Sequence, residues 1–218
     1  MNSLEKLALK FPLELKCENC SEASSIKIRL DESSFDWKCP KCGFVHTSLF
    51  GLDVTIGVRL LERSRYELTV EQDFSMAIVM AAMGLESEVS RLFDKWKSLD
   101  ADRANLPLTR EQCEEELRRM GTIDRKIDAV SQLLVNQTMD DFVSAHMGLR
   151  EMLPKFPSLQ VGSLAEGFQQ NLFWPRNKIL HWGEAKDSYD EAARCWSIAA
   201  LGVRILREMD LERRKCLN

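Results

Sequence analysis

Four cysteines near the N-terminus have the spacing of metal ligands. Cys17 and Cys20 form one C-x2-C pair, and Cys39 and Cys42 form a second pair after 18 intervening residues. Each pair in a tight turn can direct two thiolates at one metal ion, and two pairs complete the tetrahedral set that Zn²⁺ takes. Gly43 follows the second pair directly and permits a turn that points backbone amides at sulfur. The pattern predicts a bound zinc ion.

The predicted zinc ion has a structural role, because four thiolates leave no coordination position open for water. His46 lies close by as a further candidate ligand, but an ordinary strand residue is the preferred interpretation. Residues 14–50 resemble the zinc-ribbon family, which implies a small β domain. Three stretches within it have strand-like sequence, namely residues 25–30, 35–38 and 44–47. The other cysteines are Cys113, Cys195 and Cys216, of which Cys195 is predicted to be a buried free thiol.

A second set of reactive residue types follows much later in the chain. Arg176, Asn177 and His181 lie between Pro175, which suits the first turn of a helix, and Gly183, which suits its end. Asn177 and His181 are four residues apart and share a helix face. Arg176 is roughly 140° away from His181 around a straight helix, so its long side chain must curl toward that face.

The Arg–His pair also has a purely structural interpretation. Arg176 and His181 could cap a buried helix end, while Trp174 and Trp182 pack into the core.

A helical frame is predicted to position these residues. Apolar residues recur every three or four positions along a long helix that starts near Thr69, and they include Phe74, Ile78, Ala81, Leu85, Val89, Leu92 and Trp96. A second such run over residues 123–134 marks another helix, and the last helix is expected over about 189–211. Capping-box patterns stand at residues 69–72, 109–112, 163–166 and 188–191. We therefore predict a zinc ribbon over 1–50, a connecting strand or linker over 51–68, and a helical domain over 69–218. Within the connecting segment, residues 54–61 could form a strand.

The motif within this frame resembles that of HEPN-domain proteins. Their motif is an Arg followed after four to six residues by a His, commonly with Asn, Asp or His directly after the Arg, as Asn177 follows Arg176 here. The resemblance covers roughly residues 69–212 and departs from a minimal HEPN domain over residues 100–160, which are longer than such a bundle needs. The implied fold class is mainly α, a HEPN-like helical bundle preceded by a small β zinc-ribbon domain.

The resemblance implies metal-independent cleavage of RNA in a cleft between two identical protomers. His181 would take the proton from a ribose 2′-OH, Arg176 would stabilise charge on the phosphate, and Asn177 would orient His181 or a phosphate. No catalytic metal is expected. Glu86 or Glu88, on the long helix, could face the same cleft, although solvent-exposed charge is the preferred interpretation for both.

Charge and hydropathy limit the other function classes. The net charge of −4 argues against a generally basic nucleic-acid-binding surface, but it does not exclude a local basic site. No apolar run is long enough to span a membrane, and no secretory signal is present, so a cytoplasmic protein is expected. The expected partners are RNA, a second copy of the chain, and a protein activator or antitoxin of a bacterial defence or toxin-like system. Two alternatives remain open: a non-cleaving nucleotide- or RNA-binding or dimerisation module, and a zinc-ribbon adaptor.

Overall fold

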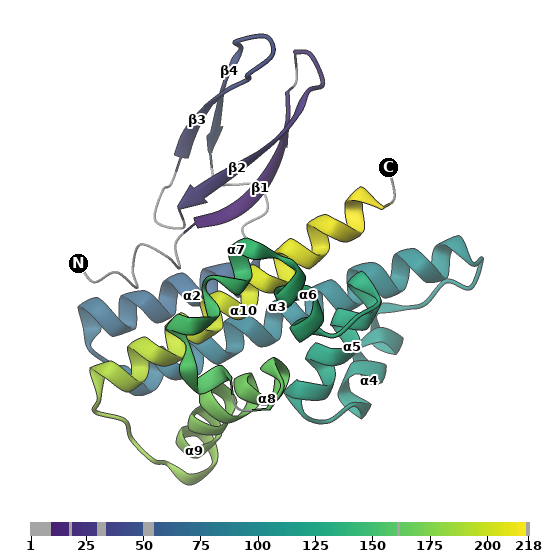
Figure 1. The fold of residues 1–218 in the computed structure, drawn as a ribbon. Coiled ribbons are helices and arrows are strands. Elements are labelled where there is room, and N and C mark those ends of the chain that lie inside the picture. The colour runs from purple at the N-terminus through teal and green to yellow at the C-terminus, as the bar shows by residue number, and fades with distance from the viewer. Residues whose placement is uncertain (1–9, 18, 30–33, 50–54, 161, 217–218) are drawn as a thin grey trace.

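The computed structural model describes residues 10–17, 19–29, 34–49, 55–160 and 162–216. Figure 1 shows two β-hairpins followed by a mainly helical body, which agrees with the predicted helical bundle. The strands and α-helices are β1 (Lys10–Lys16), β2 (Ala23–Arg29), β3 (Ser34–Lys38), β4 (Val45–Leu49), α2 (Ile56–Tyr66), α3 (Phe74–Arg103), α4 (Arg110–Arg119), α5 (Ile123–Val135), α6 (Met139–Ala145), α7 (Met147–Arg150), α8 (Leu164–Phe168), α9 (Trp174–Trp182) and α10 (Tyr189–Lys215). The short elements are the π-helical η1 (Glu67–Glu71) and η4 (Gln169–Phe173), and the 3₁₀ turns η2 (Leu153–Lys155) and η3 (Pro157–Leu159).

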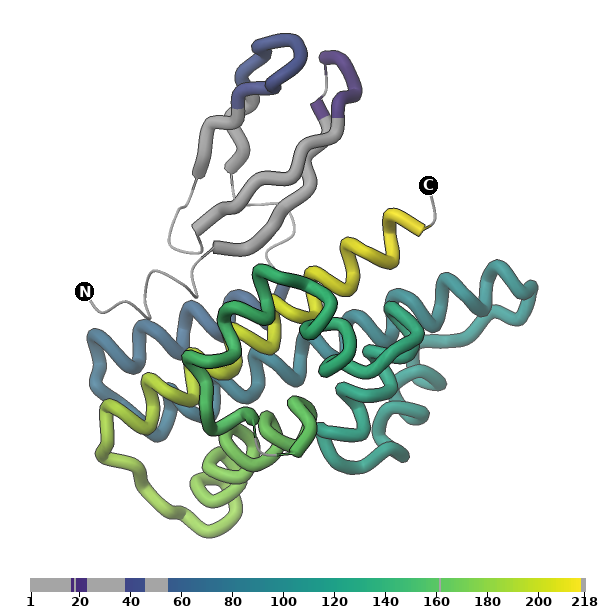
Figure 2. Tube along the Cα trace, viewed as in Figure 1, coloured from purple at the N-terminus to yellow at the C-terminus, as the bar shows by residue number. Residues whose placement is uncertain are grey.

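The four strands form two separate antiparallel hairpins. β1 pairs with β2 up to Lys16 opposite Ala23, and β3 pairs with β4 up to Lys38 opposite Val45. β2, β3 and β4 overlap the three stretches with strand-like sequence. Each hairpin turn therefore carries one C-x2-C pair. Figure 2 shows the two turns beside each other, beyond the helices.

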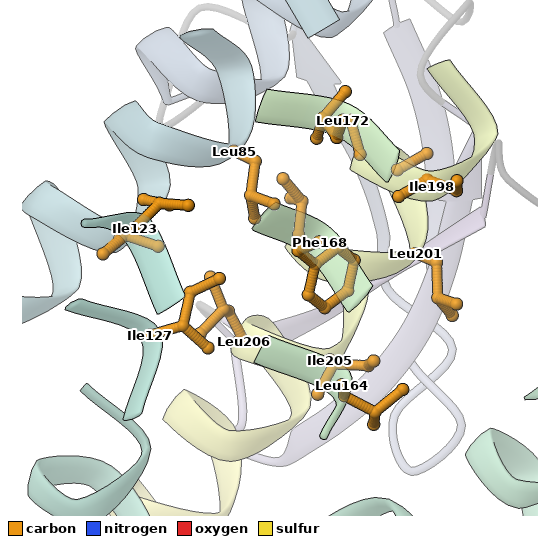
Figure 3. Packing of buried hydrophobic residues seen from close by; sticks show 14 of the residues in the cluster. Leu85, Ile123, Ile127, Leu164, Phe168, Leu172, Ile198, Leu201, Ile205 and Leu206 are labelled. Atoms are coloured by element: carbon orange, nitrogen blue, oxygen red, sulfur yellow. The ribbon is translucent and has the colours of Figure 1, made fainter. Parts of the chain in front are cut away.

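Helix α3 is the centre of the helical part. It runs antiparallel to α2 and parallel to α10, so that Ser75 contacts Lys186 near one end and Asp100 contacts Arg213 near the other. Its predicted apolar stripe is buried, and Leu85 lies within the main core with residues of α5, α8 and α10 (Figure 3). The helix begins later than the sequence suggested. Its cap is the carboxylate of Asp73, which accepts from the amide of Met76, rather than a capping box at residues 69–72.

Residues 55–68 are not a strand or a linker, which corrects the predicted organisation of this segment. Thr55 caps α2, whose buried positions Val58, Leu61 and Ser64 recur at helical spacing. The strand considered for residues 54–61 is wrong, because residues 56–61 are the first part of α2; residues 51–54 lie outside the described residues. A Cβ added at Gly57 would lie 2.5 Å from a carbonyl oxygen of α3, so α2 packs directly on that helix.

The 104–160 region supplies helices that cover the sides of α3 and α10. The predicted capping boxes at residues 109–112 and 163–166 are present with both hydrogen bonds, and they begin α4 and α8. At residues 188–191, the hydroxyl of Ser188 caps α10 by accepting from the amide of Glu191. The predicted apolar positions of α5 are buried, including Ile127 and Leu134. In the part of the chain that the structure describes, no helix has the length and apolar character needed to cross a membrane.

Candidate functional sites

The four N-terminal cysteines converge on one point. Their sulfur atoms all lie within 4.8 Å of one another, and Cys17 Sγ–Cys42 Sγ and Cys20 Sγ–Cys39 Sγ are each 3.6 Å apart. A tetrahedral metal with metal–sulfur bonds of about 2.3 Å places its sulfur ligands roughly 3.8 Å apart. The arrangement is therefore compatible with a metal site formed by both hairpin turns.

The two turns have the same backbone geometry. In the first, the amide of Cys17 donates to Glu22 O and the amide of Ser21 donates to Cys17 O; in the second, the amide of Cys39 donates to Phe44 O and the amide of Gly43 donates to Cys39 O. Ser21 (φ 58°) and Gly43 (φ 73°) take equivalent left-handed conformations. Sequence reasoning recognised Gly43 but missed Ser21, because serine carries no signal for this conformation.

The surroundings favour the thiolate form of Cys42 and oppose that of Cys20. The amide of Phe44 and the side chain of Asn19 lower the pKa of the Cys42 thiol to about 6. The backbone of Glu22 acts to lower the pKa of the Cys20 thiol, but burial and hydrogen bonds with the three other cysteines outweigh this effect and raise the pKa to about 12. Four negative thiolates this close repel one another, so a bound cation is needed to ionise them together.

The second candidate site lies on α9, the last part of a continuous helical run from Leu164 to Trp182. Pro175 has no N–H to donate to the carbonyl of Asn171, and that carbonyl instead accepts from the thiol of Cys195. The π-helical η4 segment immediately precedes this proline region, as expected where a regular hydrogen-bond ladder is interrupted. Gly183 ends α9 in a left-handed conformation (φ 67°), as predicted.

Arg176 points toward α3. Its Nη1 donates to Asn177 Oδ1 at 2.9 Å, and its Nη2 lies 3.7 Å from Glu86 Oε2. Its Nε is buried and has no hydrogen-bond partner among the described residues. Arg176 and Asn177 are thus brought together, and Arg176 keeps unused hydrogen-bonding capacity.

His181 is exposed one turn further along α9, and its side chain has no hydrogen bond or ion pair with any described residue. Its backbone position is about 140° around the helix from Arg176, and Arg176 is engaged on the α3 side. One chain therefore does not bring Arg176 and His181 into contact. The ring of His181 is free to meet a substrate or a second chain.

Two expectations about neighbouring side chains are wrong. Trp174 and Trp182 do not pack into the core: they are 49% and 64% exposed and form an edge-to-face pair with ring centroids 5.5 Å apart. Glu88 is not a solvent-exposed charge, because it is fully buried and accepts hydrogen bonds from Arg91 and Arg207. Glu86 does reach the vicinity of the motif, through Arg176.

The remaining cysteines lie outside the four-cysteine cluster. Cys195 is fully buried, as predicted, and burial raises its pKa to about 12. Cys113 is also buried, whereas Cys216 is exposed.

No protein-family model matches the chain, and neither the curated proteins nor the solved structures contain a match. The arguments for function therefore rest on the geometry of the two sites.

Proposed function

We propose that the protein is a metal-independent endoribonuclease of HEPN type, whose reactive site is shared by two copies of the chain. The observation that carries this proposal is the state of α9: His181 is exposed and unengaged, while Arg176, held by Asn177, retains a buried Nε without a described partner. These are the groups that proton transfer and phosphate stabilisation require.

The reaction would proceed by internal transfer within the RNA. His181 takes the proton of a ribose 2′-OH, and the 2′ oxygen attacks the adjacent phosphorus. Arg176 stabilises the added negative charge on the phosphate oxygens through its N–H groups. The bond from phosphorus to the 5′ oxygen breaks, and the departing oxygen takes up a proton. The products carry a 2′,3′-cyclic phosphate and a 5′-hydroxyl. The proposed nuclease would need control, either activation by a protein partner or inhibition by an antitoxin.

In this proposal the four cysteines bind one structural Zn²⁺ and make the two hairpins a zinc ribbon. The sulfur spacing and the paired turns support this identity, and all four ligands come from protein, so no position is open for catalysis. None of the seven cysteines is in a disulfide bond, which suits a reducing compartment such as the cytoplasm.

A cleavage assay tests the proposed activity. Wild-type protein is incubated with RNA in EDTA, beside His181→Ala, Arg176→Ala and the control His146→Gln, whose histidine lies on the distant α6–α7 junction. We expect cleavage by wild type and by the control, and a loss of about 100-fold or more in both α9 variants. Equal cleavage by all four proteins would contradict the assignment.

One observation favours a second candidate, a module that binds RNA without cutting it. Arg176 is occupied by Asn177 and Glu86 and does not meet His181 within the chain. This candidate predicts that wild type binds RNA, leaves it intact, and loses affinity in the same two variants.

A further inference from the structure

A groove runs beside α9, between the start of α2, α3, α4 and the start of α5. Its volume is about 650 Å³, in the range of pockets that hold small ligands or parts of larger ones. Its charged lining consists of Glu86, Arg91, Asp94, Arg110, Glu114, Arg118, Lys126 and Arg176. The groove thus begins at the motif arginine and continues along the helical part away from α9.

Positive side chains outnumber negative ones in this groove. Five cations face three carboxylates, whereas the whole chain has a net charge of −4. The excess is local, because it depends on side chains that four different helices bring together. A local excess of this kind is what attracts a polyanion to a protein that is acidic on average.

Glu86 neutralises two of these cations incompletely. Its Oε1 lies 3.5 Å from Lys126 Nζ and its Oε2 lies 3.7 Å from Arg176 Nη2, both longer than a good charged hydrogen bond. One carboxylate therefore serves two cations, and Arg176 Nε adds a buried donor without a described partner. A phosphate carries more negative charge and more acceptor oxygens at one point, so it can engage both cations better than Glu86 does.

Arg91 is held by the buried Glu88, but the exposed cation Arg110 can turn toward a ligand at small expense. Arg110 pairs with Glu114 at the mouth of the groove, and their side chains are 78% and 57% exposed. Exposed pairs on one helix contribute at most a few tenths of a kcal/mol. The groove also has apolar walls, including the half-exposed Met83 and the exposed Ile56, against which a sugar or base can pack.

We propose that this groove binds the phosphates of the RNA strand on one side of the cleavage point, and that Glu86 occupies the phosphate position until RNA displaces it. The inference rests on the proposed function, since it takes the strand to pass Arg176. It adds Arg110, Arg118 and Lys126 as substrate-binding residues and makes Glu86 a competing internal anion.

Binding of a short 2′-O-methyl RNA, which has no 2′-OH to react, tests the groove independently of cleavage. The chain offers a matched pair of arginines on α4. Arg110 lines the groove, whereas Arg119 does not; they are 78% and 77% exposed, and each pairs with a glutamate four residues away. We expect Arg110→Ala to weaken binding about fivefold and to reduce the slope of log affinity against log salt concentration by about 0.7. Arg119→Ala should change neither the affinity nor this slope.

Glu86→Gln is expected to change the RNA affinity in the opposite direction. Removing the competing charge is expected to tighten binding about threefold or more, while Glu212→Gln, whose carboxylate pairs with Lys215 and does not line the groove, leaves the affinity unchanged. Equal effects of Arg110→Ala and Arg119→Ala, or no gain with Glu86→Gln, would overturn the proposal. If AMP displaced the RNA at the same phosphate concentration, the groove would be a mononucleotide site, and the proposal that it binds an RNA strand would be overturned. If the groove variants behave as expected but wild type cuts no RNA, only the cleavage proposal fails.

Discussion

Replacing Glu88 by alanine is expected to lower the free energy of unfolding by about 3 kcal/mol, because it takes the carboxylate partner from Arg207, whose side chain is only 16% exposed. The Glu88 carboxylate is fully buried and lies 2.7 Å from Arg91 Nη2 and 3.2 Å from Arg207 Nε. Arg207 in turn donates to Thr55, the cap of α2, at 3.0 Å. The ion pairs thus join α3 to α10, and Arg207 continues the link to α2.

Urea unfolding followed by circular dichroism measures this effect, and Glu86→Ala is the matched control. Glu86 lies on the same helix two residues earlier, is partly exposed and has only long ion pairs, so we expect a change within about 1 kcal/mol. The double variant Glu88→Leu with Arg207→Leu should recover much of the loss, because it removes the less exposed of the two cations that pair with Glu88, and Arg91, which is 33% exposed, can turn to solvent. A small loss for Glu88→Ala alone would show that the pair contributes little.

The same carboxylate makes stability depend on pH. Burial acts to raise the pKa of Glu88, but the hydrogen bond from Arg91 and the charges of Arg207 and Arg91 bring it below the ordinary 4.5. The folded pKa is therefore lower than the unfolded one. The contribution is complete above about pH 4.5 and is lost as the pH falls toward the folded pKa. Glu88→Gln should remove this part of the acid dependence.

If the four cysteines hold the proposed zinc ion, chelation is expected to release one metal ion per chain and unfold the two hairpins, while the helices remain. The four sulfur ligands come from the hairpin turns alone. The main core, by contrast, consists of residues from Val58 onward, and none of the hairpin-turn residues whose side chains the structure describes (17, 19–22 and 38–45) belongs to it. The metal site and the helical core can therefore unfold independently of each other.

A chelator titration with a colorimetric zinc indicator measures the release, and circular dichroism at 222 nm follows the helices. Cys39→Ser should yield protein with little zinc, whereas Cys216→Ser, which changes an exposed cysteine outside the cluster, should retain it. Loss of most helical signal on chelation would contradict the separation of the two parts.

Features encoded within a few residues could be predicted from the sequence. The cysteine spacing fixes which sulfur atoms meet, and the capping boxes of α4 and α8 lie within four residues each. Residues 54–61 were harder, because a short apolar stretch of this kind suits a strand as well as a helix. Packing against α3 decides between them, and no pattern within the segment records that contact.

Features that join distant segments could not be predicted. Glu88 and Arg207 are 119 residues apart in the chain, so the burial of Glu88 depends on how α3 and α10 align. The groove is likewise assembled from separate helices, and no spacing links Lys126 to Arg176. The exposure of Trp174 and Trp182 also follows from which face of α9 meets the core. Sequence reasoning identified Arg176 and His181 but could not show that one chain keeps them apart.

Mixing two inactive variants tests the shared site most directly. Arg176→Ala and His181→Ala chains are unfolded together, refolded as a mixture, and assayed for RNA cleavage in EDTA beside wild type. If each site takes its arginine from one chain and its histidine from the other, half of the dimers are mixed, and each of these has one intact site. We predict about a quarter of the wild-type rate from the mixture and almost none from either variant alone. An inactive mixture beside an active wild type would contradict the shared site.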